Sequence, residues 1–200
     1  MTISASTPRL RATLLWHLAL IGLTAVTRSV PWHPVVATAL DVVGLWLVAL
    51  ACLGRIWCSI FIAGRKDIEL VTVGPYALCR HPLYTLSMLG ALGLGFASHS
   101  LTLTAATLLV LGSLSIRAAA AEDRFLAARF DERFEAYRRS TPTFWPTRWR
   151  LALPGSATVR PAILWKAFVD AAAFFVLYAM VVMARQWSDL GLLPAPLLLP

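Results

Sequence analysis

The chain has 200 residues, of which 58% are hydrophobic and only 14% are charged, with a mean hydropathy of +0.70. A soluble domain carries charge on roughly a quarter of its residues, so this composition excludes an ordinary water-soluble protein and indicates an integral membrane protein. The net charge of +8 suggests nucleic acid as one partner. The basic residues, however, form no run with interleaved aromatic residues and fall between apolar segments, as membrane topology requires. We therefore expect no nucleic-acid partner.

Five apolar runs are long enough to cross a membrane, because about 20 apolar residues span the hydrocarbon and somewhat fewer suffice where neighbouring helices shield the ends. The runs cover residues 10–26, 35–63, 83–98, 101–116 and 162–184. His99 and Ser100 alone separate the short third and fourth runs, which predicts a helical hairpin. Gly90, Gly93 and Gly95 in the third run predict close helix packing. The predicted fold class is all-α, a polytopic integral membrane protein with about five transmembrane helices.

A charged amphipathic helix is predicted after the fourth run, at residues 117–139. Leu126, Phe130, Phe134 and Tyr137 form an apolar stripe on it at helical spacing, so this helix should leave the bilayer and lie at its cytosolic face. We expect a single membrane domain over residues 1–200, with an N-terminal helical hairpin (1–63), a central core (64–150) and a C-terminal transmembrane helix with a tail (151–200). The pattern does not indicate a structure for the tail.

The distribution of Lys and Arg predicts the orientation of the chain. If the N-terminus is cytoplasmic, the segments 64–82 and 117–161 are cytoplasmic too, and of the 18 Lys and Arg residues only Arg28 and Arg185 lie on the other side. The positive-inside preference supports this orientation. We expect a protein of the bacterial inner membrane with its N-terminus and its active site in the cytoplasm.

Residues 74–84, Gly-Pro-Tyr-Ala-Leu-Cys-Arg-His-Pro-Leu-Tyr, place ionisable side chains directly before the third apolar run. Ionisable groups at the mouth of a membrane helix usually serve a function. Gly74 predicts a turn, and Pro82 disfavours helix at His81 but suits the first position of the next helix. A break at membrane depth frees backbone groups that must bond to protein, water or ligand. From the residues alone, a ligand site and a simple helix start at the lipid headgroups fit equally well.

A second polar segment carries Glu122 and Asp123 out of the fourth apolar run, and we expect the two polar segments to form one site. One interpretation of Glu122 is an ion pair with Arg80 or Arg117. No second pair of ligands stands at zinc-like spacing from Cys79 and His81. We therefore expect no metal site.

Four motifs together resemble those of the isoprenylcysteine carboxyl methyltransferases and the related phospholipid methyltransferases. They are Gly-x-Tyr-x-x-x-Arg-His-Pro-x-Tyr at 74–84, the acidic pair at 122–123, Phe-x-x-x-Phe-x-x-Tyr at 130–137 and Thr-Pro-x-Phe-x-Pro at 141–146. The resemblance covers residues 71–146 and implies an all-helical membrane enzyme that uses S-adenosylmethionine at the cytosolic face. The implied substrate is a lipophilic small molecule or lipidated acceptor that enters from the bilayer, as for protein-S-isoprenylcysteine carboxyl O-methyltransferase.

Position by position, the resemblance also implies roles for individual residues. The implied cofactor contacts are Leu70, Val71, Tyr76, Arg80, His81, Pro82, Leu83 and Tyr84, and the implied catalytic residues are Glu122 and Arg117. The related enzymes have an Arg four residues before the Glu, where Ala118 stands here; Arg117 is one position earlier, which turns a helical side chain by about 100°. Asp123 stands where a second Glu is usual, and Asp131 where Gly is preferred.

Several alternatives remain open from the sequence. The acceptor can be a carboxylate, which mainly needs positioning, or an amine, for which Glu122 would take a proton; a thiol and a phenol are further acceptors. A reductase that resembles the sterol C14 reductases would use NADPH, but it calls for an added basic cluster and more membrane helices. A non-catalytic scaffold or a small transporter is the third alternative, and no inverted repeat supports the transporter. The sequence gives no indication of the oligomeric state.

Overall fold

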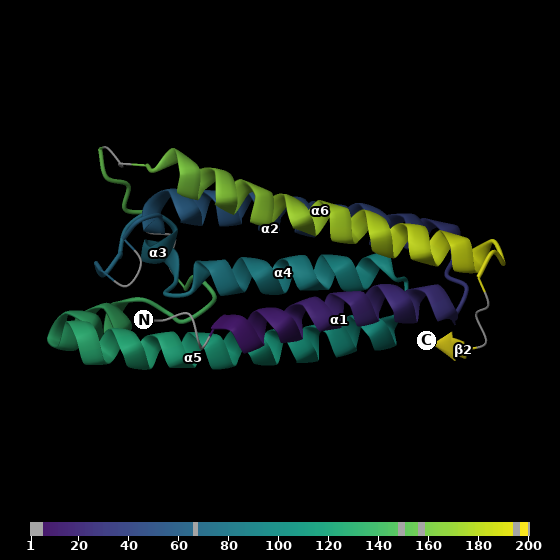
Figure 1. Ribbon diagram of the computed structural model, residues 1–200, viewed down its shortest axis with the longest axis horizontal. Helices are drawn as coiled ribbons and strands as arrows, with labels where there is room; N and C mark the ends of the chain where they lie inside the picture. Colours follow the sequence, from purple (N-terminus) through teal and green to yellow (C-terminus); the bar gives the residue numbers. More distant parts are fainter. Residues whose placement is uncertain (1–5, 66–67, 148–150, 156–158, 194–196, 200) are drawn as a thin grey trace. The chain divides into compact units, whose positions relative to one another are not determined.

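The computed structural model describes residues 6–65, 68–147, 151–155, 159–193 and 197–199 (Figure 1). Its helices and strands are α1 (Ser6–Val26), β1 (Thr27–Ser29), α2 (Pro34–Ile62), α3 (Pro75–Leu78), α4 (Pro82–Ala97), α5 (Leu101–Ser140), α6 (Pro161–Asp189) and β2 (Leu197–Leu199). The chain is 76% helical, which confirms the predicted all-α class.

Each of the five predicted apolar runs forms a helix. By length and composition, α1, α2, α5 and α6 can cross a membrane, and α4 is a shorter apolar helix of 16 residues. The predicted hairpin is present, because residues 98–100 connect α4 directly to α5. The protein is therefore a helical membrane protein of the predicted class.

The helix α5 is much longer than the fourth apolar run. It has 40 residues and includes the charged segment 117–139, which we expected to be a separate helix. No proline or glycine lies between residues 113 and 130, and the four alanines at 118–121 have the highest helix propensity of any residue. The apolar and charged parts are therefore continuous, and the first interruption comes at Asp131.

Asp131 interrupts α5 with φ 44° and ψ −121°. A positive φ brings the Cβ of most residues too close to the backbone, whereas glycine adopts it freely. The resemblance implied glycine at this position, and the backbone angle explains that preference. The side chain of Asp131 is exposed.

By their contacts, the residues group into two compact units. The first unit comprises Met1–Ala49, Met88–Leu114 and Ala173–Pro200, and the second comprises Leu50–Ser87 and Ser115–Ala172. Each unit contains parts of all three sequence segments that we distinguished, because α2, α5 and α6 each contribute to both.

The core of the first unit is apolar and tightly packed. Its buried members are Leu20, Val48, Leu94, Ala97, Leu103 and Val181. Gly93 of α4 lies against Gly44 of α2 so closely that a Cβ at Gly93 would be 2.6 Å from the Gly44 carbonyl oxygen. Gly95 lies equally close to Thr104 of α5, where a Cβ would be 2.8 Å from the Thr104 Cα. These contacts confirm the predicted close packing through small residues.

The first unit also contains a cluster of charged residues that the sequence analysis did not predict. Asp41 of α2 accepts hydrogen bonds through Oδ1 from Arg185 Nη2 of α6 and from His99 Nε2, both at 2.9 Å. Arg185 Nη1 lies 2.6 Å from His99 Nδ1. Only 7% of His99 and 9% of Arg185 are exposed. A guanidinium can only donate, so a ring nitrogen of His99 must accept from it, and an imidazole with an accepting nitrogen is neutral.

The C-terminal tail has a structure that the sequence did not indicate. The strand β2 pairs in parallel with β1, with Thr27 opposite Leu197. Ser188 Oγ donates a hydrogen bond to the Thr27 carbonyl oxygen at 2.9 Å, and Val30 N donates to Leu199 O at 3.1 Å. The tail therefore packs beside the segment that follows α1.

Acid should destabilise the protein through His99. Burial and the Arg185 guanidinium lower the pKa of the His99 imidazole, against the opposing effects of Asp41 and Asp189. The unfolded chain therefore binds the proton more readily, so the stabilisation is fully present above about pH 6.5 and is lost as the pH falls below it. Thermal unfolding in detergent should show a melting temperature that drops by a few degrees on acidification. His99→Asn should flatten this dependence and exposed His33→Asn should not; equal pH profiles for wild type and His99→Asn would contradict the assignment.

Replacing Asp131 with glycine should stabilise the protein. The positive φ is unstrained for glycine, so Asp131→Gly should raise the free energy of unfolding by about 1 kcal/mol. Asp131→Ala is the control, because it removes the same carboxylate but keeps a Cβ and should give no such gain. Thermal or denaturant unfolding of the three proteins measures the difference, and an equal gain for alanine would show that charge rather than backbone strain is responsible.

Candidate active site

All residues that we predicted for the site lie in the second unit. Gly74 has φ 62°, α3 forms a single turn after it, and Cys79 is extended with φ −152° and ψ 157°. The helix α4 then begins at Pro82. The predicted turn, backbone break and helix start are all confirmed.

The backbone groups at the break are bonded to a later part of the chain. The amide of Arg80 donates to the Pro142 carbonyl oxygen at 2.8 Å, and the amide of His81 donates to that of Thr143 at 3.0 Å. These partners belong to the Thr-Pro-x-Phe-x-Pro motif at 141–146. Buried backbone groups must be paired. The motif segment therefore provides the acceptors that the amides at the break would have found within a continuous helix.

The guanidinium of Arg80 joins three segments of the second unit. Its Nη1 donates to the carbonyl oxygens of Arg138 and Thr141, both at 3.1 Å. Its Nη2 donates to Asp123 Oδ2 and to Thr143 Oγ1, both at 2.9 Å. Only 9% of the Arg80 side chain is exposed. Both terminal nitrogens of this predicted cofactor contact are thus bonded to protein.

His81 lies between the two adjacent carboxylates of α5. Its Nε2 is 2.8 Å from Asp123 Oδ1, and its Nδ1 is 3.7 Å from Glu122 Oε2. Its ring lies against those of Tyr84 and Phe144, with centroids 5.7 and 6.1 Å away. His81 is only 3% exposed. The structure therefore brings His81, Tyr84 and Glu122 together, as the two-segment prediction requires.

A second group of predicted residues forms an apolar cluster. Tyr76, Val71 and Leu83 pack with Cys58 and Phe61. The hydroxyl of Tyr76 is buried, and it has no hydrogen-bond partner in the described part of the chain. Burial raises the pKa of the Tyr76 hydroxyl well above its usual value. The group is therefore a neutral donor with an unused hydrogen-bonding capacity.

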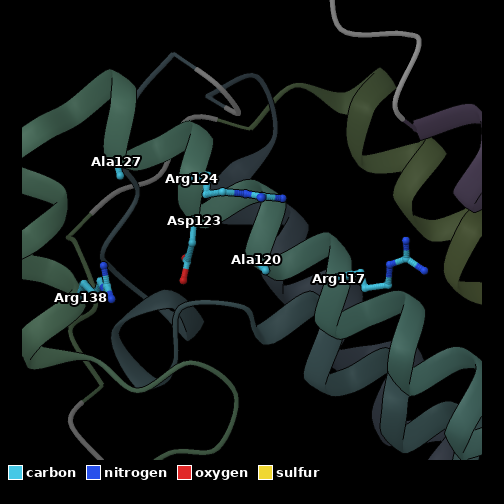
Figure 2. A pocket seen from close by; sticks show the side chains of 6 residues that line it. All are labelled: Arg117, Ala120, Asp123, Arg124, Ala127 and Arg138. Atoms are coloured by element: carbon cyan, nitrogen blue, oxygen red, sulfur yellow. The ribbon is translucent and has the colours of Figure 1, made fainter.

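The remaining predicted residues have less central positions. Pro82 is buried at the start of α4, and Leu70 is half-buried in the connection before Val71. Arg117 is exposed on α5. It lines a hollow of about 620 Å³ together with Ala120, Asp123, Arg124, Ala127 and Arg138 (Figure 2). We call this the arginine-lined hollow.

The sequence analysis missed the partner of Arg80 and the residues around it. We considered Glu122 as an ion-pair partner of Arg80, but the structure pairs Arg80 with Asp123. Tyr137 donates a hydrogen bond to the Tyr76 carbonyl oxygen at 2.6 Å, which ties the amphipathic part of α5 to α3. Tyr137 and Thr141 belong to motifs that the sequence analysis identified. The motifs indicated that these residues matter, but they did not predict which groups the residues would contact.

Comparison with known proteins identifies the family. A sequence model of phospholipid methyltransferases matches residues 32–133, which is half of the chain and includes both polar segments. The chain belongs to the phospholipid methyltransferase family. The predicted resemblance is thereby confirmed, and membership in this family indicates a membrane methyltransferase.

Two bacterial proteins that are similar to this chain have names that refer to metals. Cobalt-zinc-cadmium resistance protein CzcN of Cupriavidus metallidurans is 40% identical over 163 residues, which cover 80% of this chain and 74% of that protein. Nickel-cobalt-cadmium resistance protein NccN of Alcaligenes xylosoxydans xylosoxydans is 39% identical over 129 residues, which cover 64% of this chain and 60% of that protein. No solved structure matches the chain significantly.

Proposed function

We propose that this protein is an S-adenosylmethionine-dependent methyltransferase that acts on a lipophilic acceptor drawn from the bilayer. The observation that carries the proposal is the approach of Glu122 to His81, within 3.7 Å, which joins the two polar segments into one site. Membership in the phospholipid methyltransferase family supports the reaction class.

The residues of the site suit this cofactor. S-adenosylmethionine supplies an electrophilic methyl group on a cationic sulfonium. The carboxylate of Glu122 provides negative charge beside the buried imidazole of His81. The buried hydroxyl of Tyr76 is a hydrogen-bond donor without a partner among the described residues, and such a group is costly unless a ligand or water uses it.

The chemistry that the protein must perform depends on the acceptor. For a carboxylate acceptor, the arginine-lined hollow offers Arg117 for a bidentate hydrogen-bonded pair. For an amine or thiol acceptor, Glu122 would take the proton that the acceptor loses. We favour a carboxylate acceptor like that of the isoprenylcysteine carboxyl O-methyltransferases, with phospholipid N-methylation or small-thiol S-methylation as the alternatives.

The same proposal places the protein in the bacterial inner membrane with its site toward the cytoplasm. Apolar helices long enough to span the bilayer and the bacterial relatives support the membrane assignment. The concentration of Lys and Arg in the segments that flank the site supports the cytoplasmic orientation.

The names of the relatives suggest a physiological setting in which methyl transfer contributes to tolerance of cobalt, zinc or cadmium. Growth of a deletion strain in graded concentrations of each metal ion tests this setting. Complementation by the wild type but not by His81→Ala would support it. If wild type and His81→Ala restored growth equally, metal tolerance would not depend on methyl transfer, and the proposed setting would be wrong.

Isothermal titration of the purified, folded protein with S-adenosylhomocysteine tests the cofactor. We expect saturable binding, whereas binding of NADPH instead would favour the reductase alternative. A transfer assay with labelled S-adenosylmethionine across carboxylate, amine, thiol and phenol lipids then identifies the acceptor. Absence of binding in folded material would refute the proposed function.

Substitution of Glu122 should impair the transfer step more than cofactor binding. For an amine or thiol acceptor, removing this charge removes the group that takes the proton of the acceptor, so Glu122→Gln should lower kcat by about 100-fold. Binding of S-adenosylhomocysteine should change by only a few-fold. Glu132→Gln, at an exposed position of the same helix, is the matched control. If Glu122→Gln and His81→Ala both left kcat unchanged, the catalytic assignment would be wrong.

Substitution of Tyr76 should separate stability from ligand binding. Tyr76→Phe removes a buried hydroxyl without a partner among the described residues, so the melting temperature of the ligand-free protein should stay the same or rise. If the hydroxyl donates to the cofactor, affinity for S-adenosylhomocysteine should fall about tenfold, as expected for one lost hydrogen bond. Reduced stability with unchanged affinity would show that the hydroxyl serves the fold alone.

A further inference from the structure

The two adjacent carboxylates of α5 make different contacts with His81. Asp123 Oδ1 lies 2.8 Å from Nε2, which is a hydrogen bond, whereas Glu122 Oε2 lies 3.7 Å from Nδ1, which is beyond hydrogen-bonding distance. Successive residues of a helix point about 100° apart, so the imidazole must lie between them to contact both. The two carboxylates therefore have separable tasks.

Both oxygens of Asp123 are bonded to buried cationic or polar groups. Oδ1 faces His81, and Oδ2 accepts a hydrogen bond from Arg80 Nη2 at 2.9 Å. The side chain of His81 is 2% exposed and that of Asp123 is 22% exposed. Charge-assisted hydrogen bonds between groups this well shielded are strong and geometrically demanding.

We propose that Asp123 is the positioning residue of the site, which holds the His81 imidazole and the Arg80 guanidinium in place while Glu122 remains available to the reactants. This inference rests on the proposed function. The hydrogen bond to Asp123 keeps a proton on Nε2, so Nδ1 is the ring nitrogen that faces Glu122. Which nitrogen of a histidine carries the proton is set by the hydrogen bond that the ring makes.

The same carboxylate acts, through Arg80, on the end of α5 and on the residues that follow it. Arg80, held by Asp123 on one side, binds the carbonyl oxygens of Arg138 and Thr141 on the other. Asp123 therefore holds the start of α4 against residues 138–143. Two carbonyl oxygens of this segment also accept the hydrogen bonds of the backbone amides of Arg80 and His81. A displaced Arg80 would move both segments at once.

Asp123 bonds the His81 imidazole and also lines the arginine-lined hollow. Figure 2 shows the side chains of Asp123 and Arg124 extending in different directions from α5, although both residues line the hollow. The Asp123 carboxylate pairs with Arg80, and it lines the hollow together with the exposed Arg117 and Arg124. Without this charge, the buried Arg80 would have no carboxylate partner among the described residues, which is strongly unfavourable.

The test compares Asp123→Asn and Asp123→Glu with wild type, and Asp131→Asn serves as the matched control because it removes a carboxylate from an exposed position of the same helix. An amide cannot accept from both Arg80 and His81, so Asp123→Asn should lower kcat by about 100-fold, the loss expected when catalytic groups are misplaced by about 1 Å. Asp123→Glu keeps both acceptors and should restore at least a tenth of the wild-type kcat. Asp131→Asn should not change kcat.

Nitrogen-15 NMR of the histidine-labelled protein in detergent gives a measurement that does not depend on enzyme activity. The chain has 4 histidines, and the His81 signal is assigned by its loss in His81→Asn. We expect the Nε2–H tautomer for His81 in wild type and a mixture of tautomers in Asp123→Asn. A wild-type Nδ1–H tautomer would overturn the proposal, as would a kcat for Asp123→Asn within twofold of wild type.

The two proposals fail in distinguishable ways. If wild type binds no S-adenosylhomocysteine, the methyltransferase assignment fails while the tautomer of His81 still reports on Asp123. If wild type binds it and transfers methyl groups but Asp123→Glu rescues no better than Asp123→Asn, the positioning role fails alone. Should Asp123→Asn not fold, the wild-type tautomer and the kcat of Asp123→Glu still decide the question.

Discussion

The burial of the Arg80 guanidinium is the constraint on which the site depends. A cation taken out of water is strongly destabilising unless acceptors surround it. The two terminal nitrogens of Arg80 donate to Asp123, to Thr143 and to the carbonyl oxygens of residues 138 and 141, whereas Nε has no partner among the described residues. Since these groups are 43 to 63 positions from Arg80 along the chain, the start of α4, the charged part of α5 and the following loop can only form together.

The sequence predicted the helices well because their signal is local. Long apolar runs specify membrane helices by length and composition, and the Pro82 ring and the preceding His81 determine where α4 begins. The boundary between the fourth run and the amphipathic helix was not predictable in this way, because the alanines at 118–121 continue the helix whatever its surroundings. The pairing of β1 with β2 depends on a contact between distant segments of 3 residues each, which are too short to carry a periodic pattern.

The site was predicted in part for a comparable reason. His81 and Glu122 were paired because motifs of known relatives contain both, and the structure confirms their proximity. The division of labour between Glu122 and Asp123 was not predictable, because adjacent carboxylates look alike in a sequence and only side-chain geometry distinguishes them. The cluster of Asp41, His99 and Arg185 was invisible because its members are 58 to 144 positions apart, each a single polar residue in or beside an apolar run.

That cluster has a consequence for how the protein reaches its native state in a bilayer. Asp41 and His99 belong to segments that leave the ribosome before α6, whereas Arg185 arrives with α6. A buried charged side chain without a partner is strongly unfavourable, so the earlier helices should keep these groups accessible to water or lipid headgroups until the final helix arrives. Closure of the Asp41–His99–Arg185 contacts would then be the event that commits the nascent chain to its finished topology.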